Sequence, residues 1–147
     1  MSAPITRLAG YASVFDIPDA GGDIVRPGAF ARAVGTIVPL LWQHDAHAPI
    51  GRVDRIAQDT RGLRVIASLA DTRIGRDAVA LLRSKALTGL SFGYRVRASH
   101  PGPRGQRNLT DLELIEVSLV TFPMQRHARV IALDRQEIAV PLEETLA

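Results

Sequence analysis

Three polar residues lie in otherwise apolar or glycine-rich segments, where a purely structural design would not place them. Ser91 sits between Gly89 and Gly93, His44 follows a short apolar run, and Glu116 interrupts a second apolar run. Serine, histidine and a carboxylate together can act as nucleophile, general base and the acid that orients the base. A buried carboxylate is costly unless it is paired, so Glu116 requires a partner. Our working hypothesis is a serine nucleophile at Ser91 activated by His44 and Glu116.

Each of these residues also has a structural interpretation. Ser91 could be an ordinary strand serine, His44 a satisfied polar residue at a strand end, and Glu116 the partner of an arginine in a salt bridge. Asp45 is a rival for the third catalytic role, although capping of the polar turn is the favoured interpretation for it. The presence of all three residue types in one small chain favours the catalytic interpretation.

Two motif matches point to other chemistry and are rejected. Gly89-x-Ser91-x-Gly93 fits the nucleophile elbow of α/β-hydrolases, but that motif needs a strand before the serine and a helix after it, and here the order is reversed. His44-x-x-His47 resembles part of a zinc site. It lies in a turn without the accompanying glutamate, and a zinc site normally needs three or four protein ligands. We therefore expect no metal and no cofactor.

Composition indicates an ordinary globular chain. The 147 residues are enough for one domain with a hydrophobic core, with 46% hydrophobic and 22% charged residues. There is no cysteine, and no apolar run approaches the length that spans a bilayer. The net charge is only +3, and the arginines are scattered. A basic hairpin lacks interleaved aromatic residues for stacking on bases, so a solvated loop is favoured over a nucleic-acid site. Its basic residues are Arg95, Arg97, His100, Arg104 and Arg107.

Hydrophobic periodicity predicts a β-rich α/β domain with a small barrel or strongly bent sheet. Strands are predicted over residues 5–15, 23–26, 37–42, 50–58, 62–69, 89–97, 107–120 and 128–133. A helix is predicted over residues 73–84 with Thr72 as its cap, and a shorter one over 27–34. Residues 99–106 are expected to form an exposed hairpin loop. The domain is expected to end at residue 133, and residues 134–147 to form a partly disordered tail with weak helical character.

Five short motifs, in order between Leu8 and Val130, resemble those of the tailed-phage prohead (capsid maturation) serine proteases. They are Gly10-Tyr11-Ala12-Ser13-Val14-Phe15; Gly22-Asp23 with Pro27-Gly28-Ala29-Phe30; Leu41-Trp42-Gln43-His44-Asp45 with Pro49-Ile50-Gly51; Gly89-Leu90-Ser91-Phe92-Gly93-Tyr94; and Leu114-Ile115-Glu116-Val117-Ser118-Leu119-Val120 with Pro123. The resemblance implies an assemblin-like fold, a small closed antiparallel β-barrel flanked by a few helices.

The resemblance also implies a function. The chain would be a serine endopeptidase that cleaves the scaffold segment of the major capsid protein, and itself, during procapsid maturation. Its nucleophile motif falls on Ser91, its histidine motif on His44 and its third member on Glu116, where the herpesvirus relatives use a second histidine. The implied partners are the major capsid protein and further copies of this chain, with a dimer as one form, and neither a membrane nor nucleic acid. The implied location is the cytoplasm of a bacterial host, inside assembling procapsids.

One departure from the family pattern concerns the oxyanion side of the site. The family often continues Pro-Ala-Asn-Pro after the last long strand, whereas this chain has Pro123-Met124-Gln125-Arg126. Arg126 and Arg129 fall where the assemblin relatives carry arginines that help to hold the oxyanion. Two other classes stay open: a catalytically inactive scaffold or interaction module of a capsid assembly, and a basic capsid-lining protein that binds nucleic acid.

Overall fold

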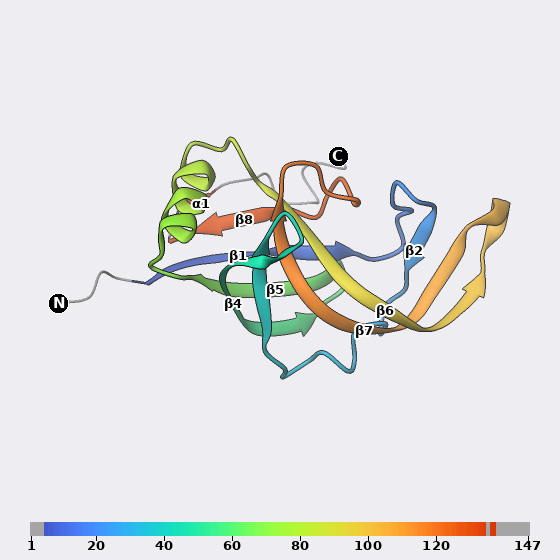
Figure 1. The fold of residues 1–147 in the computed structure, drawn as a ribbon. Helices are drawn as coiled ribbons and strands as arrows, with labels where there is room; N and C mark the ends of the chain where they lie inside the picture. The colour runs from blue at the N-terminus through green and yellow to red at the C-terminus, as the bar shows by residue number, and fades with distance from the viewer. Residues whose placement is uncertain (1–4, 135, 138–147) are drawn as a thin grey trace.

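The computed structural model describes residues 5–134 and 136–137, which form a strongly curled β-sheet with an α-helix packed against it (Figure 1). The strands are β1 (Thr6–Val14), β2 (Asp23–Val25), β3 (Val38–Trp42), β4 (Asp45–Gln58), β5 (Gly62–Leu69), β6 (Gly89–Pro101), β7 (Arg107–Val120), β8 (Val130–Leu133) and β9 (Gln136–Glu137). The helical elements are α1 (Arg73–Arg83) and the 3-10 turn η1 (Pro103–Gly105).

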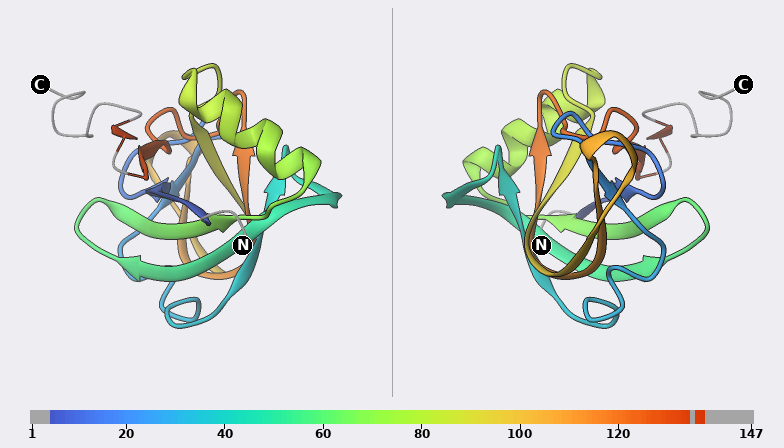
Figure 2. Two further views of the ribbon diagram at one scale, coloured as in Figure 1. Left: turned by 90° about the vertical axis from the view of Figure 1, so that its left-hand side faces the viewer. Right: turned by 90° about the vertical axis from the view of Figure 1, so that its right-hand side faces the viewer.

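All nine strands of the described chain belong to one sheet. Its order is β2-β7-β3-β4-β5-β1-β8-β9, with β6 paired to β7 outside this path. The sheet curls until the start of β6 meets the segment before β8 (Figure 2). At this point Gly89 pairs with Arg129, and the Leu90 amide donates to the Ala128 carbonyl at 2.9 Å. The predicted β-rich, strongly bent sheet is confirmed. The sheet is mixed, however, because β2 and β3 run parallel to β7, which the long stretch of chain between β3 and β7 allows.

The predicted helix is present as α1. It begins after Thr72, whose hydroxyl accepts a hydrogen bond from the Gly75 amide at 3.1 Å, as expected for a helix cap. Ala78 and Leu82 are fully buried and lie one turn apart on the face that meets the sheet. The helix packs on β4 and β5, at the end of the sheet away from the tip of the β6–β7 hairpin (Figure 1). No helix in the described residues is long and apolar enough to cross a bilayer.

The core lies inside the curl of the sheet. Strand β5, predicted over the same residues, alternates regularly: Leu63, Val65, Ala67 and Leu69 are buried and the residues between them are not. The long β6–β7 hairpin continues past this core as an arm (Figure 1). Its strands pair as far as residues 101 and 107, so the loop is shorter than the predicted 99–106.

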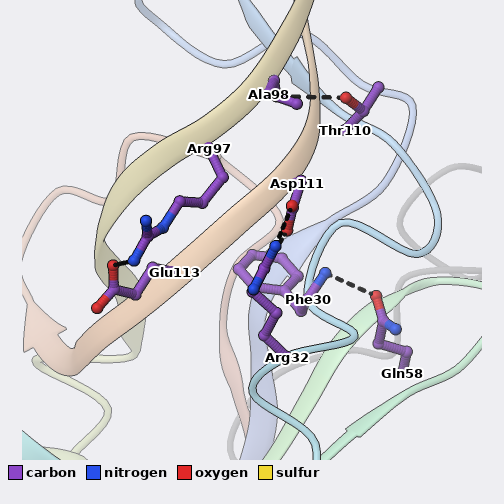
Figure 3. Close-up of polar contacts among 8 residues, drawn as sticks. All are labelled: Phe30, Arg32, Gln58, Arg97, Ala98, Thr110, Asp111 and Glu113. Atoms are coloured by element: carbon purple, nitrogen blue, oxygen red, sulfur yellow. Dashed lines mark hydrogen bonds and ion pairs between the residues drawn. The ribbon is translucent and has the colours of Figure 1, made fainter.

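The short helix predicted over residues 27–34 is wrong. The segment is a run of turns whose hydrogen bonds join residues three apart, and Gly28 has a φ of 90°, which a right-handed helix does not accept. The buried side chain of Phe30 anchors the segment to the core instead. Phe30 is fully buried, and its amide donates to Gln58 Oε1 at 3.1 Å (Figure 3). Its ring meets that of Phe92 edge-on, with the centroids 5.1 Å apart.

The predicted tail over residues 134–147 lies mostly outside the described residues. Of the part that the structure describes, residues 136–137 form β9 beside β8. The sheet therefore continues past the domain end predicted at residue 133.

Candidate active site

Strand β6 presents Ser91 on the face of the sheet opposite to its aromatic residues. Phe92 and Tyr94 pack against the core with ring centroids 4.7 Å apart, as the alternation of side chains along a strand requires. Ser91 is 6% exposed and lies directly across from Ser118 of β7. Side chains opposite each other in an antiparallel pair have Cβ atoms about 5 Å apart, so the two serines are neighbours on one face.

A β-bulge at Ile115 decides which way the carboxylate faces. The consecutive residues Gly93 and Tyr94 pair with Glu116 and Leu114, so Ile115 has no partner in β6. In an uninterrupted strand, Glu116 would lie on the same face as Leu114, which is turned toward the core. The extra residue reverses the alternation and turns the carboxylate to the face that carries the candidate nucleophile.

A two-residue hairpin turn between β3 and β4 holds His44. Trp42 and Asp45 pair across the turn, and Gln43 and His44 have φ values of 50° and 60°. This left-handed conformation is typical of tight hairpins, although it is strained for residues other than glycine. The Gln43 side chain fastens the turn to the end of β7, because it donates to Thr121 Oγ1 at 2.7 Å and accepts from the Thr121 amide at 3.2 Å.

The histidine and the glutamate form a close pair. Nδ1 of His44 lies 2.5 Å from Oε1 of Glu116. The hydrogen bond to Glu116 raises the pKa of His44, against the opposing effect of partial burial, and the negative charge of Glu116 adds to the rise. The imidazole side chain is 42% exposed and the carboxylate side chain 10%. The pair is thus open to solvent at the base and covered at the acid.

Gly93 is required for this pair. A Cβ atom at position 93 would lie 2.4 Å from Oε1 of Glu116, far inside contact distance. The structure gives the space at Gly93 to the carboxylate, and the space at Gly89 to the Val120 carbonyl and the Pro123 ring.

This arrangement has the elements of a nucleophile and its activating base. A carboxylate on Nδ1 fixes the imidazole tautomer and leaves Nε2 to exchange a proton with another group. Ser91 lies beside Gly93 and Ser118 on the same face, and the Ser118 hydroxyl accepts from the His44 amide at 3.1 Å. Three separate segments of the chain therefore meet around Ser118: Ser91 lies opposite it, and its hydroxyl is hydrogen-bonded to the His44 amide and to the Glu116 carboxylate.

The segment after β7 closes the other side of β6. Its position depends on Gln125, whose buried side chain accepts from the Val14 amide at 2.7 Å and donates to the Val14 carbonyl at 3.2 Å. Arg129 pairs with Gly89, and its guanidinium donates to the Thr88 hydroxyl at 3.1 Å. Partial burial, together with the nearby positive charge of Arg126, lowers the pKa of Arg129. Of the two arginines, Arg129 has the closer ties to the strand of Ser91, while Arg126 is exposed.

The rival residues take other roles. Asp45 accepts a hydrogen bond from the His47 amide at 2.8 Å, which is the turn-capping role that the sequence favours for it.

Several arginines in and near the hairpin arm form ion pairs with acidic residues of the described chain. Figure 3 shows the Arg97–Glu113 and Arg32–Asp111 pairs. The ion pairs are Arg97–Glu113 at 2.6 Å, Arg32–Asp111 at 2.9 Å and Arg107–Asp23 at 2.9 Å.

Sequence reasoning missed two residues that shape the site, Ser118 and Gln43. Ser118 is fully buried, and its hydroxyl donates to Oε2 of Glu116 at 2.6 Å. A serine two positions from a buried glutamate was the available signal, because alternation puts both on one face of the strand. The sequence holds no comparable signal for Gln43, since its contact with Thr121 depends on how β3 and β7 pair.

A model of one protein family, described as Caudovirus prohead serine protease, matches residues 2–141 of this chain. The chain is 33% identical over 133 residues to the prohead protease of Enterobacteria phage HK97, which covers 84% of this chain and 58% of that protein. It is 30% identical over 148 residues to the capsid polyprotein of Pseudomonas phage PAJU2, and this alignment covers 92% of this chain and 21% of that protein. The chain thus spans about three-fifths and one-fifth of the lengths of these relatives.

Solved herpesvirus proteases share the fold. The Kaposi's sarcoma herpesvirus (KSHV) protease in complex with a hexapeptide phosphonate inhibitor superposes with a TM-score of 0.65, at 15% identity over 90% of this chain and 66% of that one. The varicella-zoster virus protease gives a TM-score of 0.58, at 17% identity over 90% and 65%. The assemblin-like fold implied by the sequence motifs is confirmed.

Proposed function

This chain belongs to the caudovirus prohead serine protease family, and from that premise we propose that it is a serine endopeptidase with Ser91 as nucleophile, His44 as general base and Glu116 as orienting acid. The observation that carries the proposal is the 2.5 Å contact between His44 Nδ1 and Glu116 Oε1, on the face of the sheet that holds Ser91. A buried carboxylate behind a half-exposed imidazole is the arrangement that activates a serine.

The proposed reaction proceeds through an acyl-enzyme. The Ser91 hydroxyl attacks the scissile carbonyl while His44 Nε2 takes its proton, and the C–O bond to Ser91 forms as the carbonyl becomes an oxyanion. His44 then gives the proton to the leaving amine as the C–N bond breaks, and water repeats the sequence to release the acid. Glu116 accepts the Nδ1 hydrogen bond throughout and stabilises the transient imidazolium.

The oxyanion would be held by backbone amides with help from an arginine. Arg129 is the better supported of the two candidates, because it pairs with Gly89, two residues before Ser91 on the same strand. Residues opposite each other in a bridge share a face of the sheet, and so do residues two apart on a strand, so the Arg129 side chain leaves the backbone on the Ser91 face. Loss of one oxyanion donor typically lowers kcat by about 10²–10³-fold.

The proposed substrates are the scaffold segment of the major capsid protein and the chain itself, during procapsid maturation. The names of the relatives support this, since one is a prohead protease and the other a capsid polyprotein. The reaction would take place inside assembling procapsids in the cytoplasm of a bacterial host. Self-association of the chain stays a prediction.

Co-expression of the full chain with the capsid protein encoded beside it, followed by mass spectrometry of both proteins, tests this proposal. We expect wild type to yield trimmed capsid protein, and Ser91→Ala and His44→Ala to yield only the uncut form. His47→Ala is the matched control, because His47 is an exposed histidine on the same hairpin as His44, and its replacement removes the same imidazole side chain. Trimming by Ser91→Ala would contradict the proposal.

The same experiment separates the alternatives. An inactive scaffold or interaction module would co-purify with uncut capsid protein in the wild type as well. A capsid-lining nucleic-acid binder would instead retain DNA with a steep dependence on salt. Glu116→Gln keeps the shape of the side chain and should slow trimming less than Ser91→Ala does. If Glu116→Gln is silent, Asp45 or His47 becomes the better third member.

A further inference from the structure

We infer that Ser118 is a positioning residue for this site: its hydroxyl links the Glu116 carboxylate to the backbone of the His44 turn and so fixes the geometry of the base. The inference rests on the proposed function, because it assigns Ser118 a part in the same proposed reaction. Ser118 does not contact the reacting atoms in this assignment. It acts through the two residues that it joins.

The two hydrogen bonds of the Ser118 hydroxyl can be assigned in only one direction each. The Ser118 Oγ atom lies 2.6 Å from Glu116 Oε2 and 3.1 Å from the His44 amide nitrogen. A carboxylate can only accept and an amide can only donate, so the hydroxyl donates to the first and accepts from the second. Each carboxylate oxygen of Glu116 then has one donor, Ser118 on Oε2 and the His44 ring on Oε1.

The fold brings these groups together through two non-local features. The bulge at Ile115 turns both Glu116 and Ser118 to the outer face of β7. The parallel pairing of Leu41 with Ser118 then sets the end of β3, and with it the His44 turn, beside that face. Because the turn has left-handed backbone angles at non-glycine residues, it needs an external anchor, and the Ser118 hydroxyl supplies one at the catalytic residue itself.

Ser118 is a poor nucleophile for the same reasons. It is fully buried, whereas Ser91 directly opposite retains 6% exposure. Its proton is committed to the Glu116 carboxylate, and its contact with His44 is to the backbone amide rather than to the ring. The two serines therefore have separate roles: Ser91 retains some exposed surface, and Ser118 is fixed beneath the base.

Two readouts test this role in the full chain. The first is the rate at which a fluorophosphonate probe labels Ser91. We expect Ser118→Ala to lower it by about 10–100-fold, because small displacements of a catalytic group can cost about 100-fold. The second is the downfield proton resonance of the His44 Nδ1–H group, recorded in a Ser91→Ala background. We expect it to move upfield and to exchange faster with water in Ser118→Ala, since the bond to Glu116 is less well held.

Ser13→Ala is the matched control. Ser13 is also fully buried in a strand, but its hydroxyl has no hydrogen-bond partner in the described chain. The Ser13→Ala variant therefore removes the same oxygen atom from the interior without breaking a hydrogen bond. We expect both readouts to stay at the wild-type value. Ser118→Thr keeps the hydroxyl and should recover most of the labelling rate. Ser118→Cys, close to serine in size but a weak donor, should reproduce the alanine result if Ser118→Ala fails to fold.

An unchanged labelling rate in Ser118→Ala would overturn the inference, and so would an Nδ1–H resonance that stays in place or moves further downfield. The resonance does not require activity. If no protein, wild type included, reacts with the probe, the proposed function fails, while the resonance still reports whether Ser118 holds the pair.

Discussion

Gly93→Ala is the perturbation that tests the His44–Glu116 pair with the smallest chemical change. The added methyl would lie 2.4 Å from Oε1 of Glu116 and 3.0 Å from its Cδ and Cγ atoms. The obstructed group is the end of a flexible side chain rather than backbone, so the carboxylate is expected to move and the fold to persist. The backbone at Gly93 does not have a left-handed φ, so alanine fits its conformation.

The expected magnitudes follow from opposing effects. Replacing glycine by alanine at a compatible position stabilises a protein by about 0.4–1 kcal/mol. Loss of a hydrogen bond to a charged group costs about 1.5–3 kcal/mol, so a net loss of about 1–2 kcal/mol in the free energy of unfolding is expected while His44 is protonated. Activity should fall much further. Removing the correct orientation of a catalytic histidine by its carboxylate lowers kcat by up to about 10⁴-fold, and we expect at least about 100-fold here.

The assay combines NMR titration of the His44 ring with fluorophosphonate labelling of Ser91. Because the hydrogen bond to Glu116 is the main cause of the raised pKa of His44, the pKa should fall in Gly93→Ala. The control is Gly102→Ala, which lies in the loop at the tip of the hairpin arm, just past the end of β6. An added Cβ there would have its nearest neighbours at 3.3 Å and would not touch Glu116. A Gly93→Ala protein with a wild-type labelling rate and an unchanged His44 pKa would refute the role given to Glu116.

Two further predictions concern the same turn. The raised pKa of His44 means that its pairing with Glu116 contributes full stability below pH 6.5, the ordinary histidine pKa, and that this contribution is lost as the pH rises through the higher folded-state pKa. The free energy of unfolding of wild type relative to His44→Gln, from urea titrations, should therefore decrease with pH in that window; a constant difference would contradict the pairing. Gln43→Ala removes the contacts with Thr121 and should lower the labelling rate by about 10-fold, with about 1 kcal/mol lost in stability. Equal rates in Gln43→Ala and wild type would show that the turn needs no such anchor.

The parts of the fold that depend on local pattern could be read from the sequence. The β6 alternation that puts Ser91 on one face and Phe92 on the core face is visible in successive residues, and so is the cap of α1 at Thr72. The candidate site residues Ser91, His44 and Glu116 stood out because polar side chains in apolar or glycine-rich surroundings need a reason. All three lie together in the structure, although their chemical roles stay a proposal.

The parts that depend on pairing between distant strands could not be read in this way. The bulge at Ile115 looks like one more apolar residue in a hydrophobic run, yet it decides the face on which Glu116 lies. The parallel pairing of β3 with β7 determines what Gln43 and Ser118 contact. The turns around Phe30 resembled a helix because proline and alanine suit one, whereas Gly28 and the burial of Phe30 decided otherwise.

The identity of the residue that a fluorophosphonate probe modifies tests the central claim most directly. Mass spectrometry of the labelled full chain, co-expressed with its capsid protein, would locate the adduct. We expect it on Ser91, with labelling lost in His44→Ala and retained in His47→Ala. An adduct on Ser118 or another residue, or undiminished labelling of Ser91 in His44→Ala, would contradict the assignment of this chain as a serine peptidase of the proposed type.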